Sequence, residues 1–404
     1  MAQLIGNIPP ADESLMGLIE RHSDTLSSQL QAHHLSVFPP HADKTIRYFQ
    51  PAEAARFIGV KEVYLRTLAN DLADDLDVST GPAGRRSYSA MDMHKIRNHL
   101  DKVGRGSRRY LPHRRNGEDL QVISVMNFKG GSGKTTTAAH LAQYLALRGY
   151  RVLAIDLDPQ ASLSTLLGVQ PETDVGEGET LYGALRYEAP RPMHEIVRGT
   201  YIPDLHLVPG NLELMEFEHD TPRALMKRKP GDVMFFQRMK AALASVKDNY
   251  DVVVVDCPPQ LGYLTLSAIA AATSLLVTVH PQMLDVMSMN QFLSMMSDLL
   301  REIAGHGAEF DYKWMRYLIT RFEPSDGPQN QMVGYLRAMF GDNVLIHPML
   351  KTTAVSDAGL TNQTLFEVER AAFTRATYDR AMEAMNNVNG EIESLIRKAW
   401  GRAA

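Results

Sequence analysis

The segment from residue 122 to residue 147 constrains the fold of this chain more than any other part. A β-branched run at residues 122–126 leads directly into residues 127–136, Asn-Phe-Lys-Gly-Gly-Ser-Gly-Lys-Thr-Thr, and an alanine-rich helical pattern follows. The glycines allow the backbone to curl so that several N–H groups point toward one centre, and the N-terminus of the helix adds a positive field there. A strand, a glycine-rich turn and a helix in this order predict a loop that binds phosphate groups.

Two side chains of this loop have distinct expected roles. Lys134 is placed to reach the β- and γ-phosphates of a nucleotide, and the hydroxyl of Thr135 is placed to ligate Mg²⁺. The commonest loop of this kind has a glycine where this chain has Phe128, and here a second lysine, Lys129, opens the loop. The loop therefore predicts a nucleotide and Mg²⁺ as ligands, and the resemblance given below implies that the nucleotide is ATP. The residues expected to bind the nucleotide are Lys129, Gly130, Gly131, Ser132, Gly133, Lys134, Thr135 and Thr136.

Carboxylates follow two further β-branched runs. Residues 155–162 read Ile-Asp-Leu-Asp-Pro-Gln-Ala-Ser, and the two-residue period of a strand directs Asp156 and Asp158 to one side. Residues 251–259 read Asp-Val-Val-Val-Val-Asp-Cys-Pro-Pro, so that Asp256 emerges from a buried strand. Ligands of parallel sheets bind at the carboxyl ends of the strands, which places these carboxylates at the expected site, and the resemblance to Walker B given below implies that Asp256 holds a water on Mg²⁺. The alternative is that these carboxylates only cap helices.

The C-terminal two thirds of the chain predict an α/β fold. Short β-branched runs alternate with helical stretches, which indicates a parallel sheet flanked by helices over residues 121–404. The expected strands are residues 122–126, 152–155, 205–208, 252–255, 275–279 and 317–320. A long amphipathic helix, from Tyr378 to Ala399, is expected near the C-terminus.

The N-terminal third predicts a small, mainly helical domain over residues 45–102. A helix over residues 51–58 ends at Gly59, a second helix covers residues 60–72, and a hairpin over residues 79–88 precedes a helix capped by Ser89. Helix, glycine turn, helix and basic hairpin are typical of a winged helix-turn-helix. We expect residues 1–44 to hold an amphipathic dimerisation helix (residues 11–33) and a linker, and residues 103–120 to form a basic linker.

Charge and cysteine content narrow the function classes. The net charge is −5, but residues 81–116 hold ten lysines and arginines against two aspartates. Such a patch suits DNA phosphates, although a solvated linker gives the same pattern.

The single cysteine, Cys257, excludes an intramolecular disulfide framework and a multi-thiolate metal site within one chain. The uncharged residues 261–279 are too polar for a membrane span, so we expect a cytoplasmic protein without a membrane partner.

The helical domain resembles the MerR-like winged helix-turn-helix family. The resemblance is carried by Ala54-Ala55, Gly59-Val60, Leu65-Arg66 and the hairpin residues 84–88, Gly-Arg-Arg-Ser-Tyr. It implies that the second helix enters the major groove and that the hairpin follows the DNA backbone. The residues so implied are Lys61, Tyr64 and Arg66 on the helix, and Arg85, Arg86 and Tyr88 on the hairpin. A protein-binding helical module remains the alternative.

The phosphate loop resembles the deviant Walker A motif of the MinD/ParA class of P-loop ATPases, and residues 155–162 and 251–259 resemble its Walker A′ and Walker B motifs. The resemblance implies a Mg²⁺-dependent ATPase. Lys129 would reach the nucleotide of the partner subunit in an ATP-sandwich homodimer, Asp158 would orient the attacking water, and Asp156 would lie near the water shell of the metal. The implied catalytic residues are Lys129, Lys134, Asp156 and Asp158. By weaker resemblance, Thr320 and Arg321 would border the adenine, and Lys351 and Arg370 would lie on a non-specific DNA surface.

The whole pattern is similar to the long-form ParA (RepA-type) plasmid partition ATPases, over residues 121–370 and the domain before them. That similarity implies an ATP-bound dimer on nucleoid DNA in the bacterial cytoplasm, hydrolysis stimulated by a ParB-type centromere-binding protein, and repression of its own operon by the N-terminal domain. Two alternatives stay open. One is a transcriptional repressor that only senses nucleotide, and the other is a MinD-like membrane-associated positioning ATPase, suggested by the basic amphipathic residues 392–402.

Overall fold

The computed structural model describes residues 14–37, 44–80, 86–104 and 109–403. It divides into two units, Met1–Lys44 and Thr45–Ala404, and each is described by itself. The first unit contains helix α1, Leu15–Val37. Leu15, Ile19 and Leu26 lie on this helix with more than half of their surface exposed. The predicted amphipathic helix is therefore present, shifted by four residues, and its apolar stripe is uncovered within its own unit.

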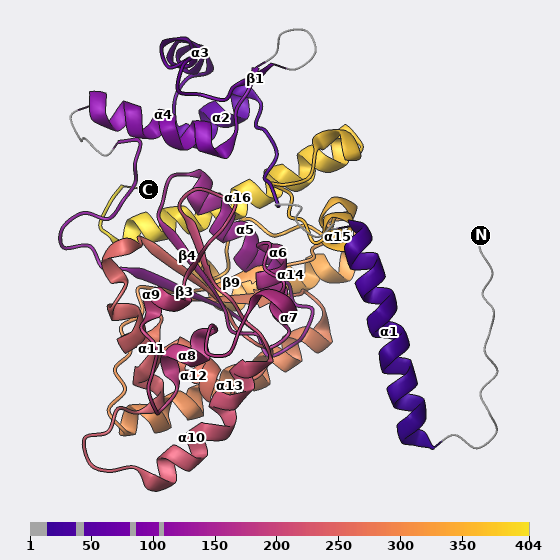
Figure 1. Cartoon of the computed structure of the whole chain (residues 1–404), viewed down its shortest axis with the longest axis vertical. Coiled ribbons are helices and arrows are strands. Elements are labelled where there is room, and N and C mark those ends of the chain that lie inside the picture. The colour runs from indigo at the N-terminus through magenta and orange to yellow at the C-terminus, as the bar shows by residue number, and fades with distance from the viewer. Residues whose placement is uncertain (1–13, 38–43, 81–85, 105–108, 404) are drawn as a thin grey trace. The chain divides into compact units, whose positions relative to one another are not determined.

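The second unit is built on a seven-stranded sheet (Figure 1). Its strands are β3 Gln121–Met126, β4 Val152–Asp156, β5 Arg198–Gly199, β6 Leu205–Val208, β7 Val252–Asp256, β8 Ser274–Val279 and β9 Trp314–Ile319. The order across the sheet is β5-β6-β4-β7-β3-β8-β9, with every pair parallel except β5 with β6. The predicted α/β class and all six predicted strands are confirmed. The short antiparallel β5 was not predicted, since two residues carry no periodic signal.

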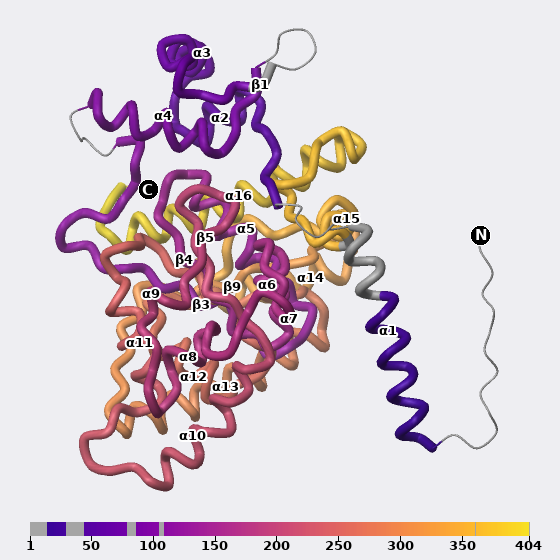
Figure 2. Tube along the Cα trace, viewed as in Figure 1, coloured from indigo at the N-terminus to yellow at the C-terminus, as the bar shows by residue number. Residues whose placement is uncertain are grey.

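Helices cover both faces of the sheet, and each face has its own hydrophobic core. Because successive side chains of a strand alternate, Ile123 faces the core shared with α5 and α16, while Val122 faces the core shared with α11, α12 and α13. The chain can be followed through these layers in Figure 2. The larger helices are α5 Lys134–Leu147, α10 Met215–Lys227, α11 Phe235–Ala244, α12 Tyr263–Ala271, α13 Met283–Gly305, α14 Gly327–Phe340, α15 Thr353–Leu360 and α16 Arg375–Ala399, and the short ones are α6 Ser162–Leu166, α7 Pro171–Asp174, α8 Leu181–Leu185 and α9 Met193–Ile196.

Three helices and a two-stranded ribbon form the helical module, residues 45–103. The elements are α2 Pro51–Ile58, α3 Glu62–Asp71, α4 Ala90–Val103, β1 Ser79–Thr80 and β2 Arg86–Ser87, with the strands antiparallel. Gly59 ends α2 with φ at +83°, in the left-handed region that glycine adopts readily. The Ser89 hydroxyl accepts from the Asp92 N–H at 3.0 Å, and the Asp92 carboxylate accepts from the Ser89 N–H at 2.9 Å. This reciprocal cap fixes the start of α4 as predicted.

The basic linker expected at residues 103–120 is anchored rather than solvated in its described part. The Arg114 guanidinium donates to the backbone carbonyls of Tyr250 and Glu118 at 2.9 and 3.1 Å, and its backbone N–H donates to Asp251 at 2.8 Å. The boundaries expected at residues 102 and 120 fall inside the second unit. Sequence composition alone missed this attachment because two of these acceptors, Tyr250 and Asp251, lie more than 130 residues away.

The uncharged stretch at residues 261–279 forms α12 followed by the buried strand β8. Within the described ranges, no helix combines the length and the apolarity that crossing a membrane requires.

Candidate nucleotide-binding site

The glycine-rich loop lies between the carboxyl end of β3 and the first turn of α5. Gly131 and Gly133 have φ at +71° and +85°, and a Cβ at Gly133 would meet Thr320 at 3.4 Å. The Thr320 hydroxyl donates to the carbonyl of Ser132 at 2.8 Å, and the Thr278 hydroxyl donates to the Ser132 hydroxyl at 3.0 Å. The loop is therefore held in its curled form by residues at the carboxyl ends of β8 and β9, as well as by its own glycines.

A cavity of about 490 Å³ opens at this loop. Its volume lies within the ~300–1,000 Å³ range of small-molecule sites. The predicted residues Lys134, Thr135 and Asp158 line it. The full lining is Gly130, Gly131, Gly133, Lys134, Thr135, Thr136, Asp158, Gln160, Ser162, Pro259, Thr320, Arg321, Met349, Leu350, Lys351, Thr352, Val355, Ser356 and Gly359. The structure thus brings together the loop, the residues after β4 and β9, and α15.

Lys134 is buried at the start of α5, with its Nζ donating to the carbonyl of Lys129 at 3.1 Å. Burial lowers the pKa of its ammonium group, while the charges of Asp256 and Asp158 oppose that shift. A charged lysine that lies near two carboxylates and donates to one carbonyl can also donate to phosphate oxygens.

Asp156 and Asp256 end neighbouring strands and lie directly opposite each other in the parallel register of β4 and β7. Both are fully buried. Burial and the neighbouring negative charge raise the pKa of Asp256, and burial likewise raises the pKa of Asp156. Two buried like charges at one sheet edge favour either a shared proton or a bound cation.

The two carboxylates differ in their hydrogen bonds. Asp156 accepts from the N–H and hydroxyl of Ser164 at 2.8 and 2.7 Å, and from the N–H of Asp158 at 3.2 Å. It does not line the cavity, and its catalytic role, implied by resemblance, stays a prediction. Its bonds fix the loop that carries Asp158 at the cavity wall. Ser164 was missed because a serine eight residues from an aspartate gives no sequence signal.

Asp256 has the features of a cation ligand. Among the described residues its two buried oxygens have no well-aligned hydrogen bond, although the Thr135 hydroxyl lies close enough to lower the pKa of this carboxyl by hydrogen bonding. Thr135, which lines the cavity, offers a hydroxyl oxygen from the first turn of α5. Mg²⁺ prefers oxygen ligands and retains several waters, so the residues present fit the predicted site, with Thr135 as a ligand and Asp256 acting through a water.

Lys129 does not line the cavity in this single chain. Its Nζ lies 2.7 Å from a carboxylate oxygen of Asp285, in the first turn of α13, and the other oxygen of Asp285 lies 3.5 Å from His280 Nδ1. Asp285 is buried, whereas Lys129 is half exposed. The sequence analysis missed Asp285, since nothing in the sequence marks such a distant aspartate as the partner of this lysine.

Thr320 and Arg321 both line the cavity, and Arg321 donates from Nη1 to the carbonyl of Gly131 at 3.1 Å. Lys351 also lines the cavity, where its Nζ bonds Glu323 at 2.7 Å. Lys351 lines the nucleotide cavity with about half of its side chain exposed, and its place on a DNA surface stays a prediction. Arg370 is half exposed and paired with Asp379, outside this cavity.

The residues of the helical module that are expected to bind DNA differ in their exposure to solvent. Lys61 and Tyr64 are exposed on and beside α3, and Arg66 is exposed and paired with Glu62. Arg86 lies on β2, and Arg85 lies outside the described residues. The expectation for Tyr88 is wrong, because its side chain is fully buried and its backbone pairs with Phe49 in the core of the module. Alternation along the hairpin turns Tyr88 inward.

Comparisons with known proteins agree with this geometry. Residues 120–305 match the AAA domain family. The chain is 72% identical to a putative replication protein A of Rhizobium rhizogenes over all of both chains. It is 32% identical to the chromosome partitioning protein ParA of Myxococcus xanthus, over 62% of this chain and 81% of that protein. The chain belongs to the ParA family of ATPases. The fold agrees with that of a solved structure, an ATP complex of McdA from Cyanothece, at a TM-score of 0.55 and 19% identity, covering 71% of this chain and 99% of that one.

Proposed function

We propose that this chain is a partition ATPase that hydrolyses ATP with Mg²⁺ and uses the ATP-bound homodimer to bind nucleoid DNA without sequence preference. The observation that carries the proposal is the 490 Å³ cavity, in which the glycine-rich loop, Thr135 and Asp158 converge beside the buried Asp256. Membership of the ParA family supports it, since named relatives are partition proteins.

The residues of the cavity suit phosphoryl transfer to water. The N–H groups of the loop and the Lys134 ammonium would bind the β- and γ-phosphates, and Thr135 with Asp256 would hold Mg²⁺. The bound metal would neutralise the charge that develops on the phosphate oxygens. Asp158 lines the cavity, and its carboxylate is held by the N–H of Gln160 at 3.0 Å. From that position it would orient the attacking water.

Dimer closure requires Lys129 to change partners. In the single chain its ammonium group is bound to Asp285, whereas the sandwich proposed from resemblance needs it at the nucleotide of the partner subunit. The half-exposed position of Lys129 supports such an exchange, since its ammonium group can be reached from solvent while it is paired with the buried Asp285. Phosphate oxygens of a bound ATP carry more charge than one aspartate and would compete for the lysine.

The remaining activities rest on the N-terminal part. The exposed Lys61 and Tyr64 of the helical module support operator binding and repression of the chain's own operon. Of the ten basic residues within positions 81–116, Lys95 and Lys102 are exposed and support attraction to DNA phosphates, whereas Arg97 is buried. A ParB-type centromere-binding protein would stimulate hydrolysis and release the dimer, which would act in the cytoplasm on the nucleoid.

The test is binding of the full chain to long non-specific DNA at fixed salt, with ATP and Mg²⁺, with ADP and Mg²⁺, or without nucleotide. Fixed salt is needed because phosphate contacts weaken steeply with ionic strength. We expect coating of the DNA only with ATP and Mg²⁺. Binding that is indifferent to nucleotide, or confined to one operator sequence, would refute the partition proposal.

One observation favours the second candidate, a transcriptional repressor that senses nucleotide. The Arg148 guanidinium, just after α5, donates to the carbonyls of Arg56 and Phe57 in α2 at 3.0 Å each, and Arg97 of α4 donates to the carbonyls of Phe57 and Leu147. Helix α5 thus contacts the helical module at one end and carries the phosphate loop at the other. Absence of ATP turnover even with DNA and a partner protein would favour this candidate.

The MinD-like membrane candidate fits the structure poorly. It needs the apolar face of the last helix to be free for lipid. In the structure, Ile392 and Ile396 of α16 are fully buried, and Trp400 is buried with its indole N–H donating to the carbonyl of Asp119 at 2.8 Å.

A further inference from the structure

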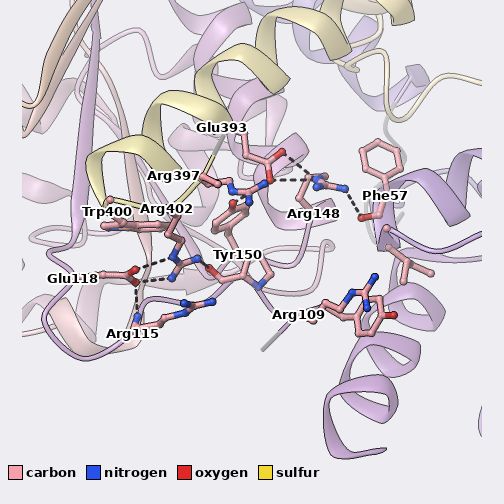
Figure 3. Close-up of a pocket in the computed structure, with 16 residues that line it drawn as sticks. Phe57, Arg109, Arg115, Glu118, Arg148, Tyr150, Glu393, Arg397, Trp400 and Arg402 are labelled. Atoms are coloured by element: carbon pink, nitrogen blue, oxygen red, sulfur yellow. Dashed lines mark hydrogen bonds and ion pairs between the residues drawn. The ribbon is translucent and has the colours of Figure 1, made fainter. Parts of the chain in front are cut away.

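A second cavity, of about 560 Å³, has no residue of the phosphate loop in its lining. Figure 3 shows the residues that form it. Three parts of the second unit form its walls. These are the end of α2 at Phe57, residues 109–118 of the segment expected to be a linker, and the core elements carrying Arg148 and Glu393. Its volume exceeds that of the nucleotide cavity and lies in the ~300–1,000 Å³ range of small-molecule sites.

The lining carries an excess of positive charge. Two carboxylates line the cavity, and each is already bound by an arginine: Glu118 by Arg402, and Glu393 by Arg148 at 3.1 Å. The lining cations are Arg109, Arg115, Arg148, Arg397 and Arg402. Three positive charges therefore remain without a lining carboxylate of their own.

Two of these three lining arginines have guanidinium groups without a hydrogen-bonded acceptor among the described residues. Within the part of the chain that the structure describes, no acceptor is hydrogen-bonded to the guanidinium group of Arg115 or of Arg397, and only the backbone N–H of Arg115 is bonded, to Glu118. The third, Arg109, lies over the ring of Tyr110 at 5.5 Å. Figure 3 shows Arg397 and Arg115 on opposite sides of the Glu118–Arg402 pair.

Arg97 is a buried arginine behind the cavity wall, and it is repelled by the positive charge of Arg148. Arg97 is almost fully buried and donates to the carbonyl of Phe57 at 2.9 Å. Burial lowers its pKa to about 9, and the positive charge of Arg148 contributes to that shift. The charges of Asp204 and Glu393 oppose the shift, and an anion bound in the cavity would offset the repulsion between Arg97 and Arg148.

We propose that this cavity binds a small, multiply charged oxyanion of the phosphate class. All its lining cations are arginines, whose planar fork of N–H donors matches phosphate oxygens. The concave shape and limited volume favour a compact anion over a polymer. Because α2 and α16 both contribute to the wall, the anion would also stabilise the contact between the helical module and the ATPase core.

The test uses the full chain carrying Lys134→Ala, so that the phosphate loop no longer binds phosphate strongly. Inorganic tripolyphosphate is titrated by isothermal calorimetry at fixed ionic strength without divalent metal. We expect saturable binding of one tripolyphosphate per chain. The same titration is repeated with the wild-type chain saturated with ADP, which fills the nucleotide cavity without the Lys134 substitution. Absence of saturable binding in both preparations would overturn the proposal.

Single substitutions then locate the anion. Arg397→Gln and Arg115→Gln each remove one guanidinium that has no hydrogen-bonded acceptor among the described residues, so neither breaks a hydrogen bond described for the fold. We expect each to weaken tripolyphosphate binding about tenfold, as the loss of one charge-assisted hydrogen bond implies. The matched control is Lys398→Gln, which removes an exposed charge next to Arg397 but outside the cavity. An equal effect of Lys398→Gln would show general attraction and overturn the site.

Competition with a DNA duplex of about 20 base pairs distinguishes a site for a free anion from a site for DNA phosphates. The proposal expects the duplex not to displace tripolyphosphate, and Arg397→Gln to leave duplex affinity within about twofold. If the duplex competes with tripolyphosphate and Arg397→Gln weakens both equally, the arginines belong to a DNA surface and the proposal is wrong. Neither result bears on the ATP-dependent coating of long DNA, which tests the partition function. The anion site and the partition function can therefore fail independently.

Discussion

Replacing Glu393 by glutamine tests whether the buried carboxylate of α16 holds the C-terminal helix on the ATPase core. Glu393 accepts from Tyr144 OH at 3.2 Å, Tyr150 OH at 3.0 Å and Arg148 Nε at 3.1 Å, and only 8% of its side chain is exposed. Glutamine keeps the shape, but it removes the charge and turns an NH₂ donor toward groups that also donate. Breaking a fully buried ion pair costs about 3–5 kcal/mol. Because 26% of the Arg148 side chain is exposed, we expect Glu393→Gln to lower the free energy of unfolding by about 2–3 kcal/mol.

The expected change is measurable by thermal unfolding followed by circular dichroism. In a large domain each kcal/mol lowers Tm by about 2 °C, so Glu393→Gln should melt roughly 4–6 °C below the wild type. The control is Glu383→Gln, which changes an exposed carboxylate on the same helix and should melt within about 1 °C of the wild type. If both variants have the Tm of the wild type, the three hydrogen bonds of Glu393 do not anchor α16.

Four further predictions concern the nucleotide site and the helical module. Lys134→Ala should abolish nucleotide binding, and ATP affinity within a few-fold of wild type in equilibrium dialysis would contradict the loop assignment. Asp158→Ala should bind ATP but release phosphate slowly, and normal turnover in a phosphate-release assay would remove Asp158 from the mechanism. Burial and the charge of Asp156 raise the folded-state pKa of Asp256, so this carboxyl favours folding when protonated and loses that contribution as pH rises through its folded pKa. Asp256→Asn should therefore raise the Tm of the metal-free chain at about pH 8, with the gain vanishing near pH 4, and an equal or lower Tm at the higher pH would refute the reasoning. Arg85→Ala with Arg86→Ala should weaken operator binding in a mobility-shift assay and spare ATP hydrolysis, and unchanged operator affinity would exclude the hairpin as a DNA contact.

The sequence predicted the sheet and the nucleotide loop well because both depend on local patterns. Six β-branched runs, each too apolar to be exposed, could only be buried parallel strands. The glycine positions of the loop needed no tertiary information, since the left-handed φ at Gly131 and Gly133 is a property of the residue type. The Ser89 cap of α4 was predictable for the same reason.

The parts that the sequence did not predict depend on partners far away in the chain. The Lys129–Asp285 ion pair joins residues from the loop and from α13, and the bond of Arg114 to Tyr250 fixes a segment whose composition indicates a linker. The resemblance of residues 84–88 to the wing of a winged helix-turn-helix implies that Tyr88 contacts DNA, yet its aromatic ring is buried in the core of the module. In each case tertiary packing decides between roles that the residue type alone allows.

The arrangement of α5 links these local and distant features. Its first turn carries Lys134 and Thr135 at the nucleotide cavity, and Arg148, immediately after its last turn, bonds α2 and Glu393. Buried side chains along the whole helix make it a poorly compressible element, so a displacement at the loop is passed on rather than absorbed. A shift of α5 by even a few tenths of an ångström on phosphate binding would therefore reach the contacts of Arg148. Because those contacts also border the arginine-lined cavity, occupancy of the two cavities should be coupled, and by linkage each ligand would alter the affinity for the other by the same factor.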